Sequence, residues 1–241
     1  MGRQEEGNSL IDEVVKACPG DQATLQAATM YYRETGDGAE PKVVDLYTQA
    51  AEQYPGNQEI LTHLFMAFVR VGNYHKQQQT ALQLHKAFPD NGPYYCWRVM
   101  SIVMQAHKST DGSLANSMFL PLAEKLMEKY VAEKKLDVEE EVKLYLMVLE
   151  KQGKPEKRLE VVQGPLGKLI RKREERNRLE LECHLSLQRW DDAVRLLTAM
   201  LRENPDHWKD IEVYISCQIE RYKESVREAK EEHEMKKRGR E

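Results

Sequence analysis

Turn residues and prolines recur at a fixed spacing along this chain of 241 residues. In four places a turn residue stands seventeen positions ahead of a proline, in the pairs Gly2 and Pro19, Gly38 and Pro55, Gly72 and Pro89, and Gln188 and Pro205. The first three prolines follow one another at intervals of 36 and then 34 residues. A period in this range is typical of an array of similar supersecondary units, each of which packs against its neighbours.

The prolines also stand in similar four-residue segments, which are Cys18-Pro19-Gly20-Asp21, Tyr54-Pro55-Gly56-Asn57, Phe88-Pro89-Asp90-Asn91 and Asn204-Pro205-Asp206-His207. Proline followed by Gly, Asp or Asn is typical of a turn. A helix-turn-helix unit of about 34 residues that ends at a proline is the tetratricopeptide pattern. The sequence therefore predicts an all-α fold, a tetratricopeptide-like α-α superhelix of helical pairs.

Apolar residues at helical spacing place the helices within this period, and the tyrosines and tryptophans at such spacing are interpreted as core residues that fill the gap between paired helices. The predicted helices are 41–54, 57–71, 93–107, 114–135, 137–152, 155–163, 174–187 and 190–203, together with one from about 5 to 18 and one that follows Asn73. The repeats are less regular between Pro89 and Pro205. We predict one array over residues 1–221, of roughly six pairs and starting in mid-repeat at Gly2. Residues 222–241 are predicted to be a charged tail, helical or disordered.

Composition excludes several classes of protein. The net charge of -4 gives no general attraction to nucleic acid or to an acidic membrane. No apolar run approaches the roughly 18 residues that suggest a membrane span, and the first residues lack the apolar core of a signal peptide. The four cysteines are far apart, with no C-x-x-C pair. Scattered cysteines in such a chain predict reduced thiols and a cytoplasmic location.

Several segments resemble one family, the auxiliary, non-catalytic subunits of the NatB N-terminal acetyltransferase complex. The segments that carry the resemblance are Tyr32-Arg33-Glu34, His63-Leu64-Phe65-Met66-Ala67, Pro93-Tyr94-Tyr95, Met118-Phe119-Leu120-Pro121-Leu122-Ala123-Glu124, Leu144-Tyr145 and Arg189-Trp190. The segment around Pro121 is the most distinctive, because a generic repeat has no proline there. Two features depart from the family: Pro155, where an aromatic residue is usual, and the charged end after Tyr222.

The resemblance implies a function for the chain. Family members are much longer, so the chain resembles their N-terminal portion. In the family this subunit wraps the catalytic subunit and helps to place the complex at the ribosome. The partner then acetylates nascent chains that begin Met-Asp, Met-Glu, Met-Asn or Met-Gln. The resemblance thus implies a scaffold whose partners are the NatB catalytic subunit and the ribosome.

No residue pattern predicts catalysis, a cofactor or a metal. Residues 33–38 match the R-x-x-G-x-G loop with which acetyltransferases bind acetyl-CoA, but that loop needs a strand before it, and residues 25–32 are predicted to be helical. Cys183 and His184 are adjacent, so on a helix they point about 100° apart and cannot form a nucleophile pair. We therefore expect a chain that is not an enzyme.

One charged segment is a candidate contact site. Its six cations are Lys168, Arg171, Lys172, Arg173, Arg176 and Arg178. Glu174 and Glu175 interrupt the run and no aromatic residue interleaves it, so one interpretation is a solvated loop and helix start. The other is a contact to ribosomal RNA, since arginine binds phosphate well. Both interpretations remain open from the sequence.

Three classes of function follow from these observations. The first is the scaffold subunit of an N-terminal acetyltransferase complex. The second is a generic tetratricopeptide adaptor that binds partner peptides or helices. The third, an enzyme in its own right, is disfavoured because no acid, base and nucleophile come together. Co-purification of the NatB catalytic subunit distinguishes the first two classes.

Overall fold

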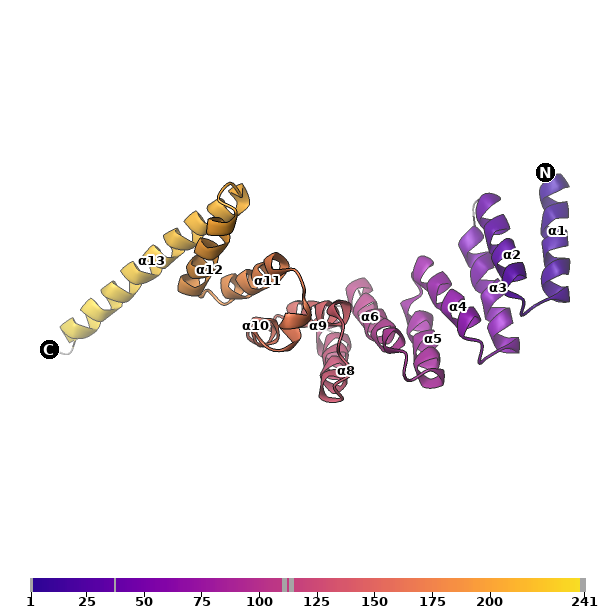
Figure 1. The fold of residues 1–241 in the computed structure, drawn as a ribbon, viewed down its shortest axis with the longest axis horizontal. Coiled ribbons are helices and arrows are strands. Elements are labelled where there is room, and N and C mark those ends of the chain that lie inside the picture. Colours follow the sequence, from indigo (N-terminus) through magenta and orange to yellow (C-terminus); the bar gives the residue numbers. More distant parts are fainter. Residues whose placement is uncertain (1, 37, 110–111, 113–114, 239–241) are drawn as a thin grey trace. The chain divides into compact units, whose positions relative to one another are not determined.

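A computed structural model describes residues 2–36, 38–109, 112 and 115–238. Over this part of the chain it contains twelve α-helices and two short helical turns, and no strand (Figure 1). The all-α fold class predicted from the sequence period is therefore confirmed. The helices form two compact units, residues 1–135 and residues 136–241, which we call unit 1 and unit 2.

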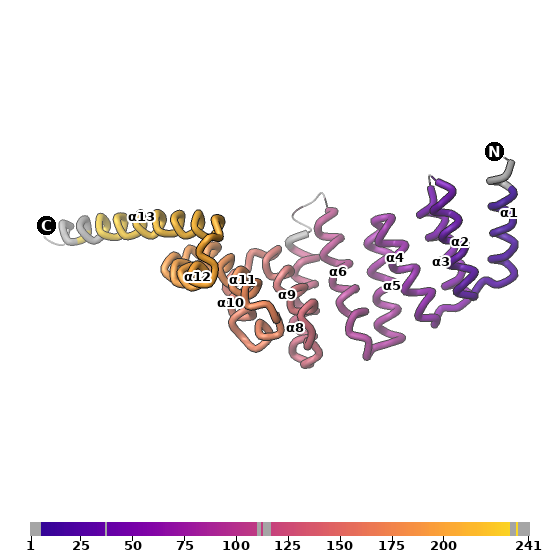
Figure 2. The backbone as a smooth tube through the Cα atoms, turned by 45° about the horizontal axis from the view of Figure 1, so that its top comes forward, coloured from indigo at the N-terminus to yellow at the C-terminus, as the bar shows by residue number. Residues whose placement is uncertain are grey.

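Unit 1 contains seven α-helices in the described residues, and a π-helical turn leads into the last of them. They are α1 (Gly2–Ala17), α2 (Gln22–Glu34), α3 (Ala39–Gln53), α4 (Gln58–Arg70), α5 (Tyr74–Ala87), α6 (Gly92–Lys108), the π-helical turn (Ala115–Phe119) and α8 (Leu120–Ala132). Successive helices run as antiparallel pairs, which the backbone trace in Figure 2 follows from α2 to α5. The predicted helix at 114–135 thus begins as a π-helical turn and ends at Ala132.

Unit 2 contains five α-helices in the described residues, interrupted by a short 3₁₀ turn. They are α9 (Glu139–Lys151), α10 (Pro155–Gln163), the 3₁₀ turn (Leu166–Leu169), α11 (Arg173–Ser186), α12 (Trp190–Glu203) and α13 (Trp208–Arg238). The helices predicted at 155–163 and 190–203 have these bounds in the structure. The predicted boundary at residue 221 lies inside α13, and the division into an array and a tail stays a prediction.

The four proline segments form the same turn. In each, the backbone N–H of the last residue donates to the carbonyl of the first, at 3.2 Å for Asp21, 3.0 Å for Asn57, 3.1 Å for Asn91 and 3.4 Å for His207. Proline suits the second position of such a turn because its φ is already close to the required value. Asn57 then caps α4, since its Oδ1 accepts from the N–H groups of Glu59 and Ile60. The segments predicted to separate helical pairs are confirmed as turns.

In a second kind of turn, a single residue with a left-handed backbone ends the helix, and the chain reverses its direction there. Gly72, Gly153, Gln188 and Lys134 have φ values between 54° and 65°. At each of them two backbone hydrogen bonds close the end of the preceding helix, as in the Schellman motif; at Gly72 these run from Gly72 to Val69 and from Asn73 to Phe68. Gly38, at φ 87°, also makes the turn that was predicted for it. The turn predicted at Gly2 is wrong, because Gly2 is the first residue of α1.

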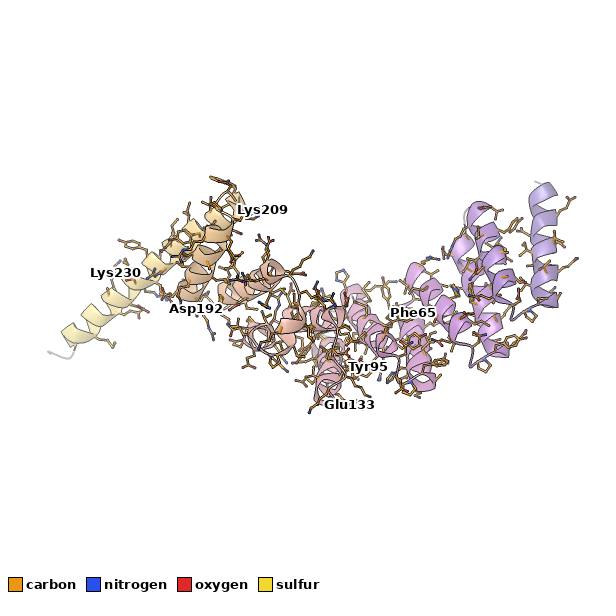
Figure 3. All side chains as sticks on the ribbon, in the orientation of Figure 1. Phe65, Tyr95, Glu133, Asp192, Lys209 and Lys230 are labelled. Atoms are coloured by element: carbon orange, nitrogen blue, oxygen red, sulfur yellow. The ribbon has the colours of Figure 1, made fainter. Side chains whose placement is uncertain are left out.

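Aromatic side chains hold neighbouring pairs together in unit 1. Phe65 of α4 stacks on Trp97 of α6 with ring centroids 4.5 Å apart. Tyr95 of α6 stacks on Tyr130 of α8 at 4.6 Å and donates its hydroxyl hydrogen to the carbonyl of Leu126 at 2.7 Å. Figure 3 labels Phe65 and Tyr95 among the side chains of the ribbon. The prediction that aromatic residues at helical spacing form the core is confirmed for these side chains.

Helix α13 departs from that prediction. It packs against α12 through one face, on which Cys217 is 1% exposed and Val213 and Tyr214 are partly buried. Trp208 and Tyr222 lie outside this packed face, and each is 72% exposed. The interpretation of these two aromatic residues as core is therefore wrong. The reason is geometric, since a helix that packs on one neighbour buries only one face.

Gln188, one of two left-handed residues other than glycine in the described part of the chain, gives a test of the turn assignment. Outside glycine this conformation costs roughly 1–2 kcal/mol, whereas glycine loses roughly 0.5–1 kcal/mol of extra chain entropy on folding. We expect Gln188→Gly to raise the free energy of unfolding, measured in urea, by about 0.5–1 kcal/mol. Gln188→Ala keeps the strain and should give no gain. A stabilisation by alanine equal to that by glycine would contradict the assignment.

Candidate functional site

The basic segment of unit 2 lies in the connection from α10 to α11. Lys168 is in the 3₁₀ turn, Arg171 and Lys172 follow it, and α11 begins at Arg173. Two features hold this connection in place. Ile170 is 0% exposed, and a Cβ on Gly167 would come within 1.8 Å of the carbonyl oxygen of Val162. Only glycine therefore lets the turn pack this closely on α10, and the cations on either side of Ile170 are exposed.

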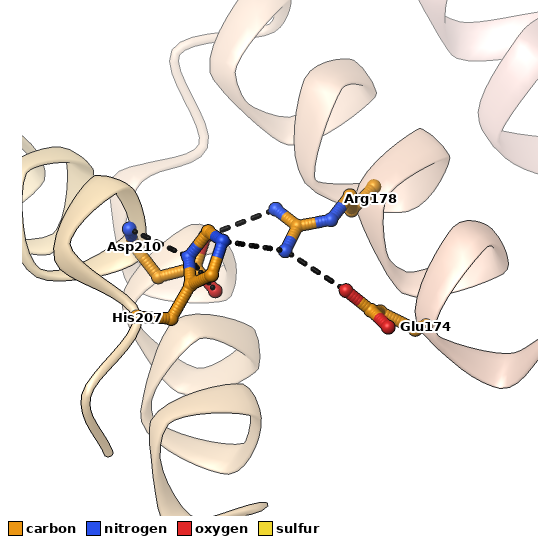
Figure 4. A network of polar contacts seen from close by, with 4 residues as sticks. All are labelled: Glu174, Arg178, His207 and Asp210. Carbon is orange, nitrogen blue, oxygen red and sulfur yellow. Dashed lines mark hydrogen bonds and ion pairs between the residues drawn. The ribbon is translucent and has the colours of Figure 1, made fainter. Parts of the chain in front are cut away.

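Two of the six predicted cations are engaged in ion pairs with carboxylates of unit 2. Arg178 donates from Nη1 to Asp210 Oδ1 at 3.0 Å and from Nη2 to Glu174 Oε1 at 3.1 Å (Figure 4). The hydrogen bond to Asp210 raises the pKa of Arg178 above its usual value. His207 Nδ1 lies 3.1 Å from the other oxygen of Asp210, whose side chain is 6% exposed. Arg173 pairs with Glu203 at 3.0 Å.

The network around Arg178 joins α11 to the first turn of α13. Glu174 and Arg178 are one turn apart on α11, while His207 and Asp210 come from the turn and helix that begin roughly thirty residues later (Figure 4). A buried carboxylate requires a partner, because an unpaired charge in an apolar environment is strongly destabilising. Arg178 therefore serves the packing of unit 2 rather than a ligand.

The side chains of the other four cations form no ion pair among the described residues, although the backbone N–H of Arg171 donates to Glu139 Oε2 at 3.3 Å. Lys168, Arg171 and Lys172 are exposed, and Arg176 is partly exposed. The nearby carboxylates are already occupied. Lys143 bonds to Glu139 and to Glu175, both at 2.7 Å, and these two hydrogen bonds raise the pKa of Lys143. The four cations thus present positive charge to solvent.

The glycine loop at the start of α3 lacks the strand that precedes an acetyl-CoA loop. Helix α2, and not a strand, leads into it, and Arg33 Nε pairs with Glu40 at 3.0 Å. Gly36 and Gly38 both have a positive φ, and Gly38 caps α3. Asp37 lies outside the described residues. Arg33 already neutralises the charge of Glu40. The loop connects α2 and α3, two helices of one repeat.

The buried cysteines are poor nucleophiles. Burial raises the pKa of Cys183 and of Cys217, which lowers the fraction of reactive thiolate at neutral pH. His184, next to Cys183, instead lies 3.6 Å from Glu180 and 3.9 Å from Asp192. Within the described ranges no three His, Cys, Asp or Glu side chains are grouped as they would be to hold a metal ion. Nor is any helix there long and apolar enough to cross a membrane.

Sequence reasoning missed Asp210 and His207 as partners of the basic segment. Both stand more than twenty-five residues beyond it, so the charge run alone gives no sign of them. One signal was available, because the segment ending at His207 was recognised as a repeat turn. A repeat turn places the start of the next helix beside the helix before last, so Asp210 was a reachable partner.

The two groups of cations should respond differently to substitution. Arg178→Met leaves Asp210 buried with one partner fewer, and we expect the free energy of unfolding to fall by about 1–3 kcal/mol. Lys172→Met removes an exposed cation without a carboxylate partner and should change that energy by less than about 0.5 kcal/mol. Urea denaturation of both variants measures the difference. Equal effects would mean that the Arg178 network contributes nothing to unit 2.

Comparison with known proteins relates this geometry to a family. A family model described as the Psidin N-terminal TPR repeats region matches residues 1–201. The protein named N-alpha-acetyltransferase 25, NatB auxiliary subunit, from Rattus norvegicus is 42% identical over 210 residues, as is its counterpart from Homo sapiens. The phagocyte signaling-impaired protein of Aedes aegypti is 33% identical over 225 residues.

The chain spans about a fifth of the length of these relatives. The match to the rat protein covers 86% of the chain and 21% of that protein, and the match to the mosquito protein covers 92% and 24%. A solved structure described as Naa15/Naa10 bound to HypK-THB superposes with a TM-score of 0.69 at 18% identity, over 90% of this chain and 32% of that one. This likeness supports the fold. The family model and the identities together show that the chain belongs to the Psidin N-terminal tetratricopeptide-repeat family, which includes the NatB auxiliary subunits.

Proposed function

We propose that the chain acts as the N-terminal region of a non-catalytic auxiliary subunit of a NatB-type N-terminal acetyltransferase complex. The observation that carries this proposal is the 42% identity over 210 residues to proteins named as NatB auxiliary subunits. In this role the chain supports the catalytic subunit in the cytoplasm. The complex acetylates nascent proteins that begin Met-Asp, Met-Glu, Met-Asn or Met-Gln. A generic tetratricopeptide adaptor is the alternative.

The structure is consistent with a supporting role. Each unit of helical pairs has a buried core, as expected of a solenoid that binds through its surface. Cys183 and Cys217, with raised pKa values, are unsuited to nucleophilic catalysis. The chain would therefore contribute contact surface, while the partner supplies acetyl transfer.

Co-purification tests the proposed partnership. The 241-residue chain, expressed with the NatB catalytic subunit of a relative, should be recovered with it in a single peak on size-exclusion chromatography. A Met-Asp peptide and acetyl-CoA should yield product only when the catalytic subunit is present. Recovery of the chain alone, without the catalytic subunit, would favour the adaptor alternative. Product from the chain alone would contradict a non-catalytic role.

We propose further that the basic segment contacts ribosomal RNA. The four cations whose side chains form no ion pair in the described part of the chain support this, since phosphate contacts need exposed positive charge. Arg173 and Arg178 are engaged with Glu203 and Asp210 and take a smaller part in it. The segment requires no defined RNA sequence, because phosphate contacts carry none.

A charge-matched pair of variants tests this contact. Lys168→Glu, Arg171→Glu and Lys172→Glu together should weaken co-sedimentation with ribosomes. The dependence of binding on salt should also become less steep, by roughly two units in a log–log plot, since each phosphate contact contributes about 0.7–0.9. The control changes Lys209, Lys223 and Lys230 of α13 to Glu, which alters the net charge equally at exposed positions. Equal weakening in both variants would show that only net charge matters.

A further inference from the structure

Helix α13 carries a second apolar face, opposite the face that packs on α12. The packed face is centred on Cys217, which is 1% exposed. On the other side of the helix, six apolar side chains stand at helical spacing: Trp208, Ile211, Ile215, Ile219, Tyr222 and Val226. Trp208 and Val226 are each nine positions from Cys217, or two and a half turns, so they point directly away from it. We call these six residues the α13 stripe.

The α13 stripe is largely open to solvent. Trp208 and Tyr222 are each 72% exposed, Ile215 is 53% exposed and Ile219 is 49% exposed. Since an aromatic side chain covers about 150–250 Å² and an isoleucine somewhat less, these four residues alone expose roughly 500 Å² of apolar surface. A continuous patch of this size is at the upper end of what a monomeric protein exposes, and such patches are often contact surfaces.

The second half of α13 extends beyond its neighbour in unit 2. Arg221 pairs with Asp191, in the first turn of α12, at 2.7 Å. The described side chains that follow Arg221 are exposed or partly exposed, and Figure 1 shows α13 continuing past α12 as a single helix. A helix is marginal in water unless a neighbour buries its apolar face. A second helix along the stripe would supply this neighbour.

The spacing of the stripe suits a straight pairing of two helices. Its last three residues, Ile219, Tyr222 and Val226, repeat the positions of its first three after eleven residues. An eleven-residue period corresponds to about 3.67 residues per turn, close to the period of a straight α-helix. The stripe therefore stays on one side of α13 over its whole length, which is roughly 27 Å at the usual rise per residue.

The stripe is also nearly symmetrical about the level of Cys217. Its residues stand nine positions, five or six positions, and two positions on either side of that level, in the pairs Trp208 and Val226, Ile211 and Tyr222, and Ile215 and Ile219. If two copies of α13 lie antiparallel and centred on this level, each member of a pair faces the other member on the second copy. The largest side chain, Trp208, then meets the smallest, Val226. This symmetry indicates a second copy of the same helix as the occupant.

Charges beside the stripe favour the same arrangement. Glu212 and Lys223 are eleven residues apart, so they stand on the same flank, five positions before and six positions after Cys217. In the antiparallel pair Glu212 of each copy lies level with Lys223 of the other, whereas a parallel pair brings like charges together. Within the described residues Glu212 forms no ion pair. Lys223 pairs with Glu220 at 2.7 Å, an exposed contact that contributes little and can exchange.

The antiparallel arrangement leaves the packing of unit 2 intact. Because the stripe points away from α12, the two α12 helices lie on opposite outer sides of the pair. The extended second half of each α13 then lies along the first half of the other. Pairing removes roughly 1,000 Å² of surface from water, near the lower limit for a specific interface. The expected dimer is therefore weak, with a dissociation constant in the micromolar range.

We propose that the chain forms a homodimer in which the α13 stripes of two copies pack against each other, antiparallel and centred on the level of Cys217. Glu212 of each copy pairs with Lys223 of the other and determines the orientation. This surface is separate from the basic segment between α10 and α11. The proposal does not depend on the NatB assignment.

Sedimentation velocity of the 241-residue chain tests the dimer. The sedimentation coefficient should rise with concentration from the value of a monomer to that of a dimer. Ile215→Gln and Ile219→Gln together should raise the dimer Kd at least tenfold and leave the thermal unfolding midpoint of the monomer unchanged, because both residues are exposed. The control changes Met30 and Met118 to Gln, which are 62% and 49% exposed and lie outside α13. Its Kd should change less than twofold.

Exchange of the flanking charges tests the orientation. Glu212→Lys alone and Lys223→Glu alone each place like charges opposite one another twice, and each should raise the dimer Kd by about fivefold. The double variant restores opposite charges in the antiparallel pair, and its Kd should return to within twofold of the original. A monomer at every concentration, equal weakening by the Met30 and Met118 control, or a double variant as weak as the single ones would each overturn the proposal.

Discussion

The whole structure depends on two turns that alternate along the chain. In one, a proline at the second position makes a tight turn and the last residue of that turn caps the next helix, as at Pro55 and Asn57. In the other, a left-handed residue such as Gly72 closes a Schellman motif. Helices of 13–16 residues, such as α1 to α4, are marginal alone in water. They persist because the turns bring each one against a neighbour on which its apolar face is buried.

The same alternation explains how much of the fold the sequence revealed. Proline and glycine signal their turns in the sequence, so the helix at 155–163 could be predicted to the residue. The start of the helix at 190–203 was predicted from the spacing of Gln188 to Pro205. Lys134 makes the same left-handed turn as Gly72, but a lysine carries no such signal. The π-helical turn at 115–119 was likewise invisible, because it differs from an α-helix only in its hydrogen bonds. The sequence therefore shows the turns in which backbone geometry requires a particular residue type. It does not show the turns that depend on packing.

The candidate sites show the same limit for side chains. Six cations between Lys168 and Arg178 form one run in the sequence. In the structure some of them pair with carboxylates and others face solvent. Arg178 meets Asp210, which lies thirty-two residues further on, whereas Lys172 faces solvent. Trp208 was expected in the core because it is aromatic, and it is exposed because α13 packs through the opposite face. Residue type alone could not show which cations are paired or whether Trp208 is buried, since partners from other helices determine both.

Register within the repeat proves more informative than local composition. A scaffold without catalytic groups binds through many weak contacts, so its binding surface has no chemical motif for a sequence search to find. It must still be continuous across repeats, and continuity requires the same position to be used in each. Met30, Met66 and Met100 show such a repeated position: they are 36 and 34 residues apart, and each stands nine residues after the N-cap of its helix. An exposed apolar residue at one position is ordinary, but its recurrence at one register on three helices is a property of the repeat that local composition does not reveal.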